Sequence, residues 1–159
     1  MFCSSLDSPI GKIFVKANES AVCYIGFAEE ISEENSNELT EMAISQLSEY
    51  FASKRTEFDF PFEQPGTDFQ QNVWKALLSI PAGKPISYAA LSKKMHHPLA
   101  IRAIAAANGK NNLMILIPCH RVIGSNGDLV GYAGGLWRKK WLLNHEAMTT
   151  QSGQSFLIL

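Results

Sequence analysis

The side chains best suited to covalent chemistry lie next to one another at Cys119, His120 and Arg121. A cysteine reacts as its thiolate, and neighbouring positive charge lowers the pKa of a thiol, so this cluster favours a nucleophilic cysteine. Because adjacent residues rarely hydrogen-bond side chain to side chain, we expect His120 to act through a water or from an offset position. The alternative is an inert buried cysteine. We favour the reactive interpretation, because the apolar run at residues 113–118 predicts a strand before Cys119 and a glycine-rich turn follows it.

The charges are distributed unevenly along the chain. Residues 1–65 hold four basic and twelve acidic side chains, a net charge of −8, whereas residues 66–159 hold ten basic and three acidic ones, a net charge of +7. Such asymmetry indicates that the second half binds an anionic partner, for which nucleic acid is the leading candidate. The alternative is that two solvated faces of the protein differ in net charge by chance.

Length and composition limit the class of protein. With 159 residues, 46% of them hydrophobic, the chain can fold as one domain or as two small ones, and intrinsic disorder is excluded. Eleven glycines and three cysteines exclude a collagen or a disulfide scaffold. The longest apolar stretch, residues 113–118, is too short to span a bilayer, and the N-terminus shows no secretory signal. We therefore expect a cytoplasmic protein with reduced cysteines and no membrane association.

The first half of the chain predicts a small sheet followed by a helix. Residues 13–15 and 22–25 are short β-prone runs, and residues 7–11 form an earlier turn, so an antiparallel meander is expected. Residues 58–66, with two prolines, predict a linker or an edge strand, and we place the domain boundary there. An acidic loop at residues 29–37 follows the β-prone runs, and a helix is predicted between this loop and residue 58. Its apolar side chains recur at helical spacing: Leu39, Met42, Ala43, Leu47, Tyr50 and Phe51.

Helices dominate the prediction for the second half. A helix is predicted to begin at Thr67, which forms a capping box with Gln70. In this motif the side chain of each residue accepts a hydrogen bond from the backbone N–H of the other. Residues 81–83 end that helix, and Ser87 is the expected N-cap of a short second helix. The first of these helices presents one apolar face: Phe69, Val73, Trp74, Leu77 and Leu78.

A further helix is predicted to begin at Pro98 and to stop at Gly109. Two helices joined by a tight turn, the second bearing Arg102, form the helix-turn-helix pattern of DNA-binding proteins. The backbone of this second helix could approach another surface closely or pack tightly in the core, and both interpretations stay open. Its side chains have little bulk because it holds five alanines: Ala100, Ala103, Ala105, Ala106 and Ala107.

These motifs together resemble the O6-alkylguanine-DNA alkyltransferase family, the methylated-DNA–protein-cysteine S-methyltransferases. The most specific elements are the Pro-Cys-His-Arg core at residues 118–121 and the glycine-rich run at residues 131–136. Residues 6–11 also resemble the strand-turn-strand opening of the family's N-terminal domain. Flanking matches extend the resemblance over residues 67–146: Phe69-Gln70, Val73-Trp74, Ile86-Ser87-Tyr88, Arg102 and Trp141 to Glu146.

The resemblance implies an α+β fold with two domains. A small N-terminal sheet-plus-helix (RNase H-like) scaffold is expected over residues 1–65. A mainly helical C-terminal domain with a winged helix-turn-helix is expected over residues 66–150, followed by a tail at residues 151–159.

The resemblance also implies an activity. Cys119 would accept the alkyl group from O6-alkylguanine in duplex DNA, after the base has flipped out, and would keep it irreversibly as a thioether. The reaction would be a single-turnover, suicide reaction, with O4-methylthymine as a further expected substrate. We expect a monomer that binds the minor groove of double-stranded DNA through its helix-turn-helix and needs no cofactor.

The same resemblance implies a role for each site residue. His120 would polarise a water against the Cys119 sulfur, and Glu146 would orient His120. Asn111 would hydrogen-bond the backbone near the reactive loop and hold the shape of that loop. Arg102 would fill the space that the guanine leaves. The remaining residues expected to contact DNA or to shape the alkylguanine pocket are Tyr88, Arg121, Val122, Tyr132, Ala133, Gly134 and Gly135.

Simpler roles stay open for several of these residues. Tyr88 could pack beneath its helix, Arg102 could be a solvated helix charge, and Glu146 could lie on the surface. Asn111 could be only a turn residue. The chain also departs from the family at Asn112, where members commonly have proline, and this departure predicts a less rigid loop.

No metal is expected, and two other function classes stay in view. Some relatives bind zinc in the N-terminal domain, but only Cys3 and Cys23 lie there, and two ligands are too few. Cys119 argues against the non-repairing relatives, in which tryptophan replaces the cysteine. The alternatives are a non-catalytic lesion sensor or regulator, and a Cys–His hydrolase, which would need a direct thiolate–imidazole contact.

Overall fold

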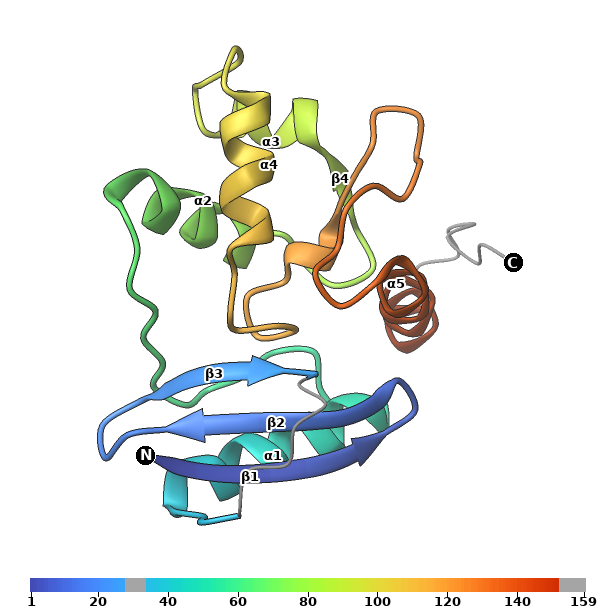
Figure 1. Ribbon diagram of the computed structural model, residues 1–159. Helices are drawn as coiled ribbons and strands as arrows, with labels where there is room; N and C mark the ends of the chain where they lie inside the picture. The colour runs from blue at the N-terminus through green and yellow to red at the C-terminus, as the bar shows by residue number, and fades with distance from the viewer. Residues whose placement is uncertain (28–33, 152–159) are drawn as a thin grey trace. The chain divides into compact units, whose positions relative to one another are not determined.

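The computed structural model describes residues 1–27 and 34–151. A sheet with one helix forms a first unit, and a second unit is mainly helical, so the chain has the expected α+β fold (Figure 1). Residues 29–33 of the predicted acidic loop at residues 29–37, and the tail after residue 151, lie outside the described residues. The sequence did not indicate that residues 112–116 belong to the first unit. The chain divides into Met1–Pro65 with Asn112–Leu116, and Gly66–Asn111 with Ile117–Leu159.

The sheet of the first unit is an antiparallel meander, as the turn signals predicted. Strands β1 (Phe2–Ser8), β2 (Gly11–Ala17) and β3 (Val22–Gly26) lie side by side in that order. Gly11 closes the first hairpin with a φ of 105°, a conformation that residues with a side chain rarely adopt. The second turn is held by Asn18, whose Oδ1 accepts the backbone N–H groups of residues 20 and 21.

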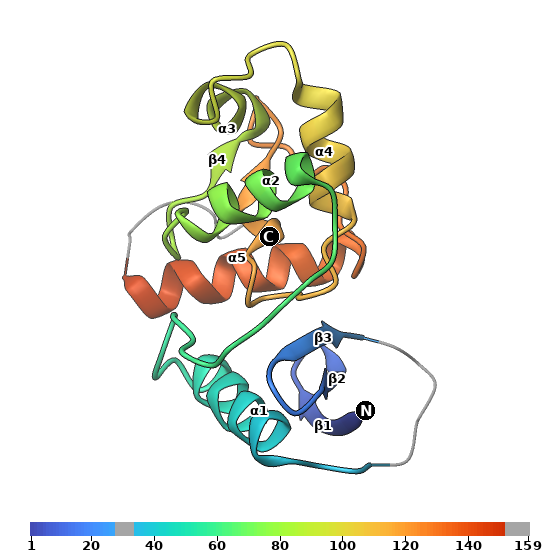
Figure 2. The ribbon, with the colours of Figure 1, turned by 90° about the vertical axis from the view of Figure 1, so that its left-hand side faces the viewer.

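Helix α1 (Glu38–Phe51) packs across one face of this sheet (Figures 1 and 2). It begins at a capping box in which Asn37 and Thr40 each accept the other's backbone N–H. Thr40 and Gln46 occupy part of its inner face, so the predicted apolar stripe is only half buried. Its members divide into the enclosed Ala43, Leu47 and Tyr50 and the partly exposed Leu39, Met42 and Phe51.

Two separate segments pair with the outer edge of β3. Residues 61–63 exchange two backbone hydrogen bonds with Val22, of 2.9 and 3.0 Å, so part of the predicted linker is an edge segment. Further along the strand, Ile25 makes two such bonds, of 2.9 and 3.0 Å, with Asn112 and Met114. The chain therefore returns to the first unit immediately before it reaches the reactive motif.

A buried side chain links these two edge segments. The Oε1 atom of Gln64 accepts the backbone N–H of Asn112. A proline at position 112 has no N–H and could not make this bond. The loop that lacks the proline common in the family is therefore restrained by a hydrogen bond instead.

In its described residues the second unit has four α-helices, one 3-10 helix and a small parallel sheet. The Thr67–Gln70 capping box and the Ser87 N-cap are both present, as predicted. Val73, Trp74 and Leu77 are buried, but Leu78 is 44% exposed because it lies in the last turn of its helix. The elements are α2 (Asp68–Leu78), β4 (Ile86–Ser87), α3 (Tyr88–Lys94), α4 (Ile101–Gly109), the 3-10 helix η1 (Cys119–Arg121), β5 (Val122–Ile123) and α5 (Leu136–Thr150).

Helices α3 and α4 form the predicted helix-turn-helix (Figure 1). The second helix begins at Ile101 rather than at Pro98. The chain leaves α3 through His96, whose φ of 59° is left-handed, and the following residues are needed to reverse its direction. Gly109 is the last residue of α4 and not a stop beyond it.

The small residues of α4 lie on two sides of the helix, one in the core and one exposed. Ala107 lies in the core, where its carbonyl accepts the indole N–H of Trp74 at 2.9 Å. Ala103 and Ala106 are exposed beside Arg102 and leave that side of the helix without bulk. A smooth outer face with one long cation is thus available to a partner.

The Gln64–Asn112 contact predicts a measurable loss of stability. In Gln64→Leu the part-buried N–H of Asn112 loses its acceptor, so we expect the free energy of unfolding in urea to fall by about 0.5–1.5 kcal/mol. Asn112→Ala is the matched control: it removes an exposed side chain and keeps the N–H, and it should change stability by less than about 0.5 kcal/mol. Equal stability of Gln64→Leu and the unaltered protein would contradict the assigned restraint.

Candidate active site

The apolar run before Cys119 is a buried turn and not the strand that the sequence predicted. Only Leu113 makes a β-bridge, to Ile25. The Leu116 N–H then donates to the Met114 carbonyl at 2.8 Å, which closes a three-residue turn around Ile115. The φ of Ile115 is 71°, a strained value for a β-branched residue. The expectation failed because the pairing of the run with β3 ends after a single bridge and the chain turns away.

Asn111 holds the backbone of the reactive cysteine, as expected. Its Nδ2 donates to the Ile117 carbonyl at 2.9 Å, and the same carbonyl accepts the Cys119 N–H at 2.7 Å. Between them Pro118 has φ −80° and ψ 64°, the relaxed form of a three-residue turn, and its ring restricts φ to this region. The Asn111 side chain also hydrogen-bonds the Cys119 thiol, so it positions both the loop and the sulfur.

Glu146 on α5 binds two residues of η1 at once. Its Oε2 lies 2.8 Å from Nε2 of His120, and its Oε1 accepts the Nε–H of Arg121 at 2.8 Å. Arg121 also donates from Nη2 to Oε2 at 2.9 Å and from Nη1 to the Ile80 carbonyl at 2.7 Å. All three charged or polar side chains are buried, so Glu146 is not the surface residue that the sequence left open.

Arg121 is a structural residue and not a contact for DNA. Its side chain is 7% exposed and its guanidinium is bound to Glu146 and Ile80. The expectation that it faces substrate or DNA is therefore wrong. A buried guanidinium needs a carboxylate partner, and Glu146 supplies it.

The Glu146 carboxylate is ionised and the His120 imidazole is neutral. Burial works to raise the pKa of Glu146, but the charges and hydrogen bonds of His120 and Arg121 hold it well below its usual range. Burial lowers the pKa of His120, and Glu146 only partly opposes that effect. With Nε2–H donating to Glu146, Nδ1 is the acceptor nitrogen; it is buried and has no partner among the described residues. His120 can therefore accept a proton at Nδ1.

The thiol of Cys119 is neutral at rest, contrary to the sequence-based expectation. Burial raises its pKa to about 11, although the hydrogen bond from Asn111 and the charge of Lys139 both lower it. The expected help from Arg121 is missing because that charge is neutralised by Glu146. Removal of the proton must therefore accompany the attack.

The remaining predicted residues differ in their burial and in their hydrogen-bond partners. Tyr88 on α3 accepts a hydrogen bond from Asn108 at 3.0 Å, and Asn108 also donates to the Cys119 carbonyl at 3.3 Å. Tyr132 has a buried hydroxyl with no partner among the described residues, and its ring lies edge-on to that of His120. Val122 and Gly134 are buried, Gly135 is partly buried, and Ala133 is exposed. Arg102 lies on the exposed side of α4 and outside the buried cluster.

Two residues of the site were missed in the sequence. Asn108 links Tyr88 to the cysteine backbone, and nothing in its sequence context marks it. Lys139 is fully buried and donates from Nζ to the carbonyls of Val130 and Gly131, at 2.7 and 3.2 Å. A signal for Lys139 did exist, because it occupies the apolar stripe of α5 at helical spacing with Leu142, Leu143 and Glu146.

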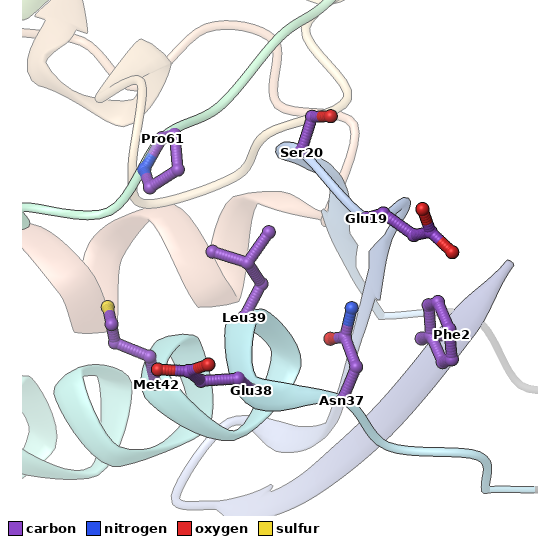
Figure 3. A pocket seen from close by; sticks show the side chains of 8 residues that line it. All are labelled: Phe2, Glu19, Ser20, Asn37, Glu38, Leu39, Met42 and Pro61. Carbon is purple, nitrogen blue, oxygen red and sulfur yellow. The ribbon is translucent and has the colours of Figure 1, made fainter.

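The first unit has a hollow of its own, which lacks the groups for this chemistry. About 460 Å³ in volume, it lies between the start of α1, the β2–β3 turn and Pro61 (Figure 3). Glu38, Leu39 and Met42 line it from the start of α1, and Glu19 and Ser20 from the β2–β3 turn. With no cysteine, histidine or lysine in its lining, it is unlike the site at Cys119.

The described part of the chain offers no group of three or more side chains that could hold a metal ion. Within the same residues, no helix has the length and apolar character needed to cross a membrane.

The buried ion pair predicts both a stability loss and a pH dependence. Glu146→Gln leaves the Arg121 guanidinium buried without its carboxylate, so the free energy of unfolding at pH 7 should fall by about 3–5 kcal/mol. Because the pKa of Glu146 is lowered on folding, its contribution is present above the usual carboxyl value of 4.5 and is lost as the pH falls further. The difference in free energy of unfolding between Glu146→Gln and the unaltered protein should therefore become smaller below pH 4.5.

Urea unfolding at several pH values measures this effect. Glu49→Gln is the matched control, since Glu49 pairs with Arg55 at 3.7 Å in a half-exposed position and should contribute less than about 1 kcal/mol. A gap between Glu146→Gln and the unaltered protein that stayed constant from pH 7 to pH 3 would rule out the assigned ion pair.

Comparison with known proteins identifies the family. Residues 1–64 match the family model described as "6-O-methylguanine DNA methyltransferase, ribonuclease-like domain", and residues 68–148 match the DNA binding domain of the same methyltransferase. Two curated relatives are named methylated-DNA–protein-cysteine methyltransferase. The protein of Mycobacterium leprae is 40% identical over 157 residues (93% of this chain, 95% of that protein), and that of Mycobacterium bovis is 43% identical over 148 residues (89% and 90%).

A solved structure gives the same result. The OGT of Mycobacterium tuberculosis, crystallised in complex with DNA, superposes with a TM-score of 0.86 at 41% identity and covers 94% of each chain. Both family models, the curated relatives and this structure agree over nearly the whole length. The chain therefore belongs to the 6-O-methylguanine DNA methyltransferase family, the methylated-DNA–protein-cysteine methyltransferases.

Proposed function

We propose that this protein repairs alkylated DNA by moving the alkyl group from guanine O6 to the sulfur of Cys119. The observation that carries the proposal is the buried pair of His120 and Glu146 beside that cysteine, with Nδ1 of the imidazole buried and without a partner among the described residues. A nucleophile, a base and a group that orients the base are what such a transfer needs. The names of the curated relatives support the same chemistry.

The transfer begins with the proton of the Cys119 thiol, which passes through one water to Nδ1 of His120. Glu146, ionised at neutral pH, stabilises the imidazolium that forms. The sulfur attacks the alkyl carbon, and the sulfur–carbon bond forms as the carbon–O6 bond breaks. The electron pair of that broken bond stays with the guanine, and the proton held by the His120 imidazolium then passes through water to the guanine, so that both groups end neutral. A thioether has no ready leaving path, so each chain reacts once.

The base must leave the duplex before it can meet a buried sulfur. Flipping costs a few kcal/mol of unstacking. Arg102 would enter the vacated space and offset part of that cost, and the smooth face formed by Ala103 and Ala106 suits close approach in the minor groove. The ten basic residues in the second half of the chain would attract the phosphates without regard to sequence.

We also propose that the protein acts as a cytoplasmic monomer that needs no cofactor. All the groups that the reaction uses come from one chain, and the cysteines at positions 3, 23 and 119 form no disulfide, as in a reducing compartment. O4-methylthymine is a second proposed substrate, because it presents the same kind of bond, between an alkyl carbon and an exocyclic oxygen of the base.

Mapping of the alkyl group tests the proposed reaction. The protein is mixed with excess duplex DNA carrying one O6-methylguanine, and its peptides are analysed by mass spectrometry. We expect one methyl group per chain, on the peptide of Cys119, and none on Cys119→Ser. Binding without transfer would leave a lesion-recognition module, and more than one turnover per chain would contradict the thioether product.

The role of Arg102 is tested with two substrates. Arg102→Ala should slow methyl transfer from duplex DNA by at least about tenfold, because the cost of unstacking is no longer offset. It should leave the reaction with the free base O6-benzylguanine unchanged, since no base then has to leave a stack. Lys75→Ala removes an equal charge from the exposed side of α2 and serves as the control. Equal losses on both substrates would contradict the role.

A further inference from the structure

Asn108, the next-to-last residue of α4, is a buried amide that uses only its donor side. The residue is 5% exposed. Its Nδ2 donates to the Tyr88 hydroxyl at 3.0 Å and to the Cys119 carbonyl at 3.3 Å. Its Oδ1 is also buried and has no partner among the described residues. Leaving a buried amide oxygen unpaired costs free energy, so this atom is suited to a donor that a substrate brings.

The contacts of Asn108 determine which way its amide faces. The Cys119 carbonyl can only accept a hydrogen bond, so the amide nitrogen and not the oxygen must face it. The same nitrogen only donates, so the Tyr88 oxygen accepts from it and the phenol proton points elsewhere. Asn108 therefore offers one acceptor, and Tyr88 one donor, that these two bonds do not use.

The acceptor of Asn108 and the donor of Tyr88 lie close enough to bind one base. The oxygen and nitrogen of an amide are about 2 Å apart, and the Tyr88 oxygen lies 3.0 Å from Nδ2, so Oδ1 is within about 5 Å of the phenol oxygen. Helices α3 and α4, which carry the two residues, lie side by side (Figures 1 and 2). The bond from Nδ2 to the Cys119 carbonyl places this pair beside the residue that bears the sulfur.

The Oδ1 atom of Asn108 is an acceptor that the proposed proton transfer does not use. Among the described residues, the other buried side-chain atoms without a partner are Nε of Arg55, Nδ1 of His120 and the Tyr132 hydroxyl. Nε of Arg55 can only donate, Nδ1 of His120 takes the thiol proton, and the Tyr132 hydroxyl can donate as well as accept. Of these four atoms, Oδ1 of Asn108 is thus the one that only accepts and has no part in the transfer.

An O6-alkylguanine carries the complementary groups on one edge. Its 2-amino group donates, and the ring nitrogens on either side of carbon 2 accept, because alkylation of O6 leaves N1 without a proton. An adjacent donor and acceptor on the base can therefore bind an acceptor and a donor on the protein. O4-methylthymine has no amino group and would leave Oδ1 of Asn108 unpaired.

We propose that Asn108 is a specificity-determining residue for guanine: its Oδ1 accepts a hydrogen bond from the 2-amino group of the flipped O6-alkylguanine. Its Nδ2 holds the Tyr88 oxygen, so that the phenol donates to a ring nitrogen of the same base. This inference rests on the proposed function. A site that binds a substrate N–H discriminates against an analogue that lacks it, because the protein acceptor is then left unpaired.

The test removes the 2-amino group from the substrate and the amide from the protein. Rates of methyl transfer to Cys119 are measured for duplex DNA carrying O6-methylguanine or O6-methylhypoxanthine, the same base without the 2-amino group. The ratio of the two rates should be about tenfold greater in the unaltered protein than in Asn108→Leu, the effect of one hydrogen bond. The two lesions differ in pairing strength, but that difference acts on both proteins and cancels when their ratios are compared.

Two control variants separate the contact with the amino group from general damage to the site. Asn72→Leu, the same change on the exposed side of α2, should keep the ratio of the unaltered protein. Tyr88→Phe should slow transfer from both bases and keep the ratio, since both bases have the ring nitrogens. If the leucine variant does not fold, as judged by circular dichroism, Asn108→Ala removes the same amide from the helix without adding bulk. An unchanged ratio in a folded Asn108 variant would overturn the inference, with Oδ1 then binding water only.

The outcome is distinct from that of the proposed function. A protein that took no methyl group from either base would contradict the proposed function, and the binding of the two duplexes, measured by fluorescence anisotropy, would then decide the inference. A preference for the O6-methylguanine duplex that is lost in Asn108→Leu would support it, and equal affinities of the unaltered protein would overturn it. Methyl transfer with the same ratio in Asn108→Leu would leave the proposed function intact and remove this inference.

Discussion

The carboxylate of Glu146 is the acceptor on which the buried site depends. It binds Nε2 of His120 and the guanidinium of Arg121 within 2.9 Å, in a place where neither cation nor base could remain without it. Through Arg121 it reaches the Ile80 carbonyl beyond the end of α2, and through His120 it fixes which imidazole nitrogen is free. One carboxylate thus joins α5, η1 and the chain after α2, and it determines that Nδ1 of His120 is the nitrogen that can accept a proton.

Two opposing requirements act on Cys119: water is excluded from its sulfur, but the thiolate that reacts is a charged form that burial destabilises. A sulfur enclosed among apolar residues is protected from water and from unselective oxidation, but burial raises its pKa to about 11. The surrounding groups reduce this penalty without removing it, because the hydrogen bond of Asn111 and the charge of Lys139 both lower the pKa of the thiol. A thiol of this kind reacts when a substrate alkyl carbon is held against it and a base accepts its proton, and is otherwise quiet.

Local signals predicted much of the fold, and non-local contacts explain the rest. The capping box at Thr67, the cap at Ser87 and the meander depend on neighbours in sequence, so they could be read directly. The turn at Ile115 could not, because an apolar, β-prone run gives no sign that its pairing ends after one bridge. Arg121 was misassigned for a related reason: adjacency to Cys119 suggested an exposed, active charge, whereas its partner is 25 residues away.

The return of residues 112–116 to the sheet edge has a consequence for the modularity of the chain. Cutting it after Pro65 would not release a self-sufficient C-terminal fragment, because that fragment would carry away a buried apolar strand partner of β3. The orphaned stretch would expose apolar side chains and unpaired amides directly before the reactive motif, while the sheet would be left with an open edge prone to self-association. The polypeptide passes between the two units three times, so a cut after Pro65 separates segments that pair with each other in the fold.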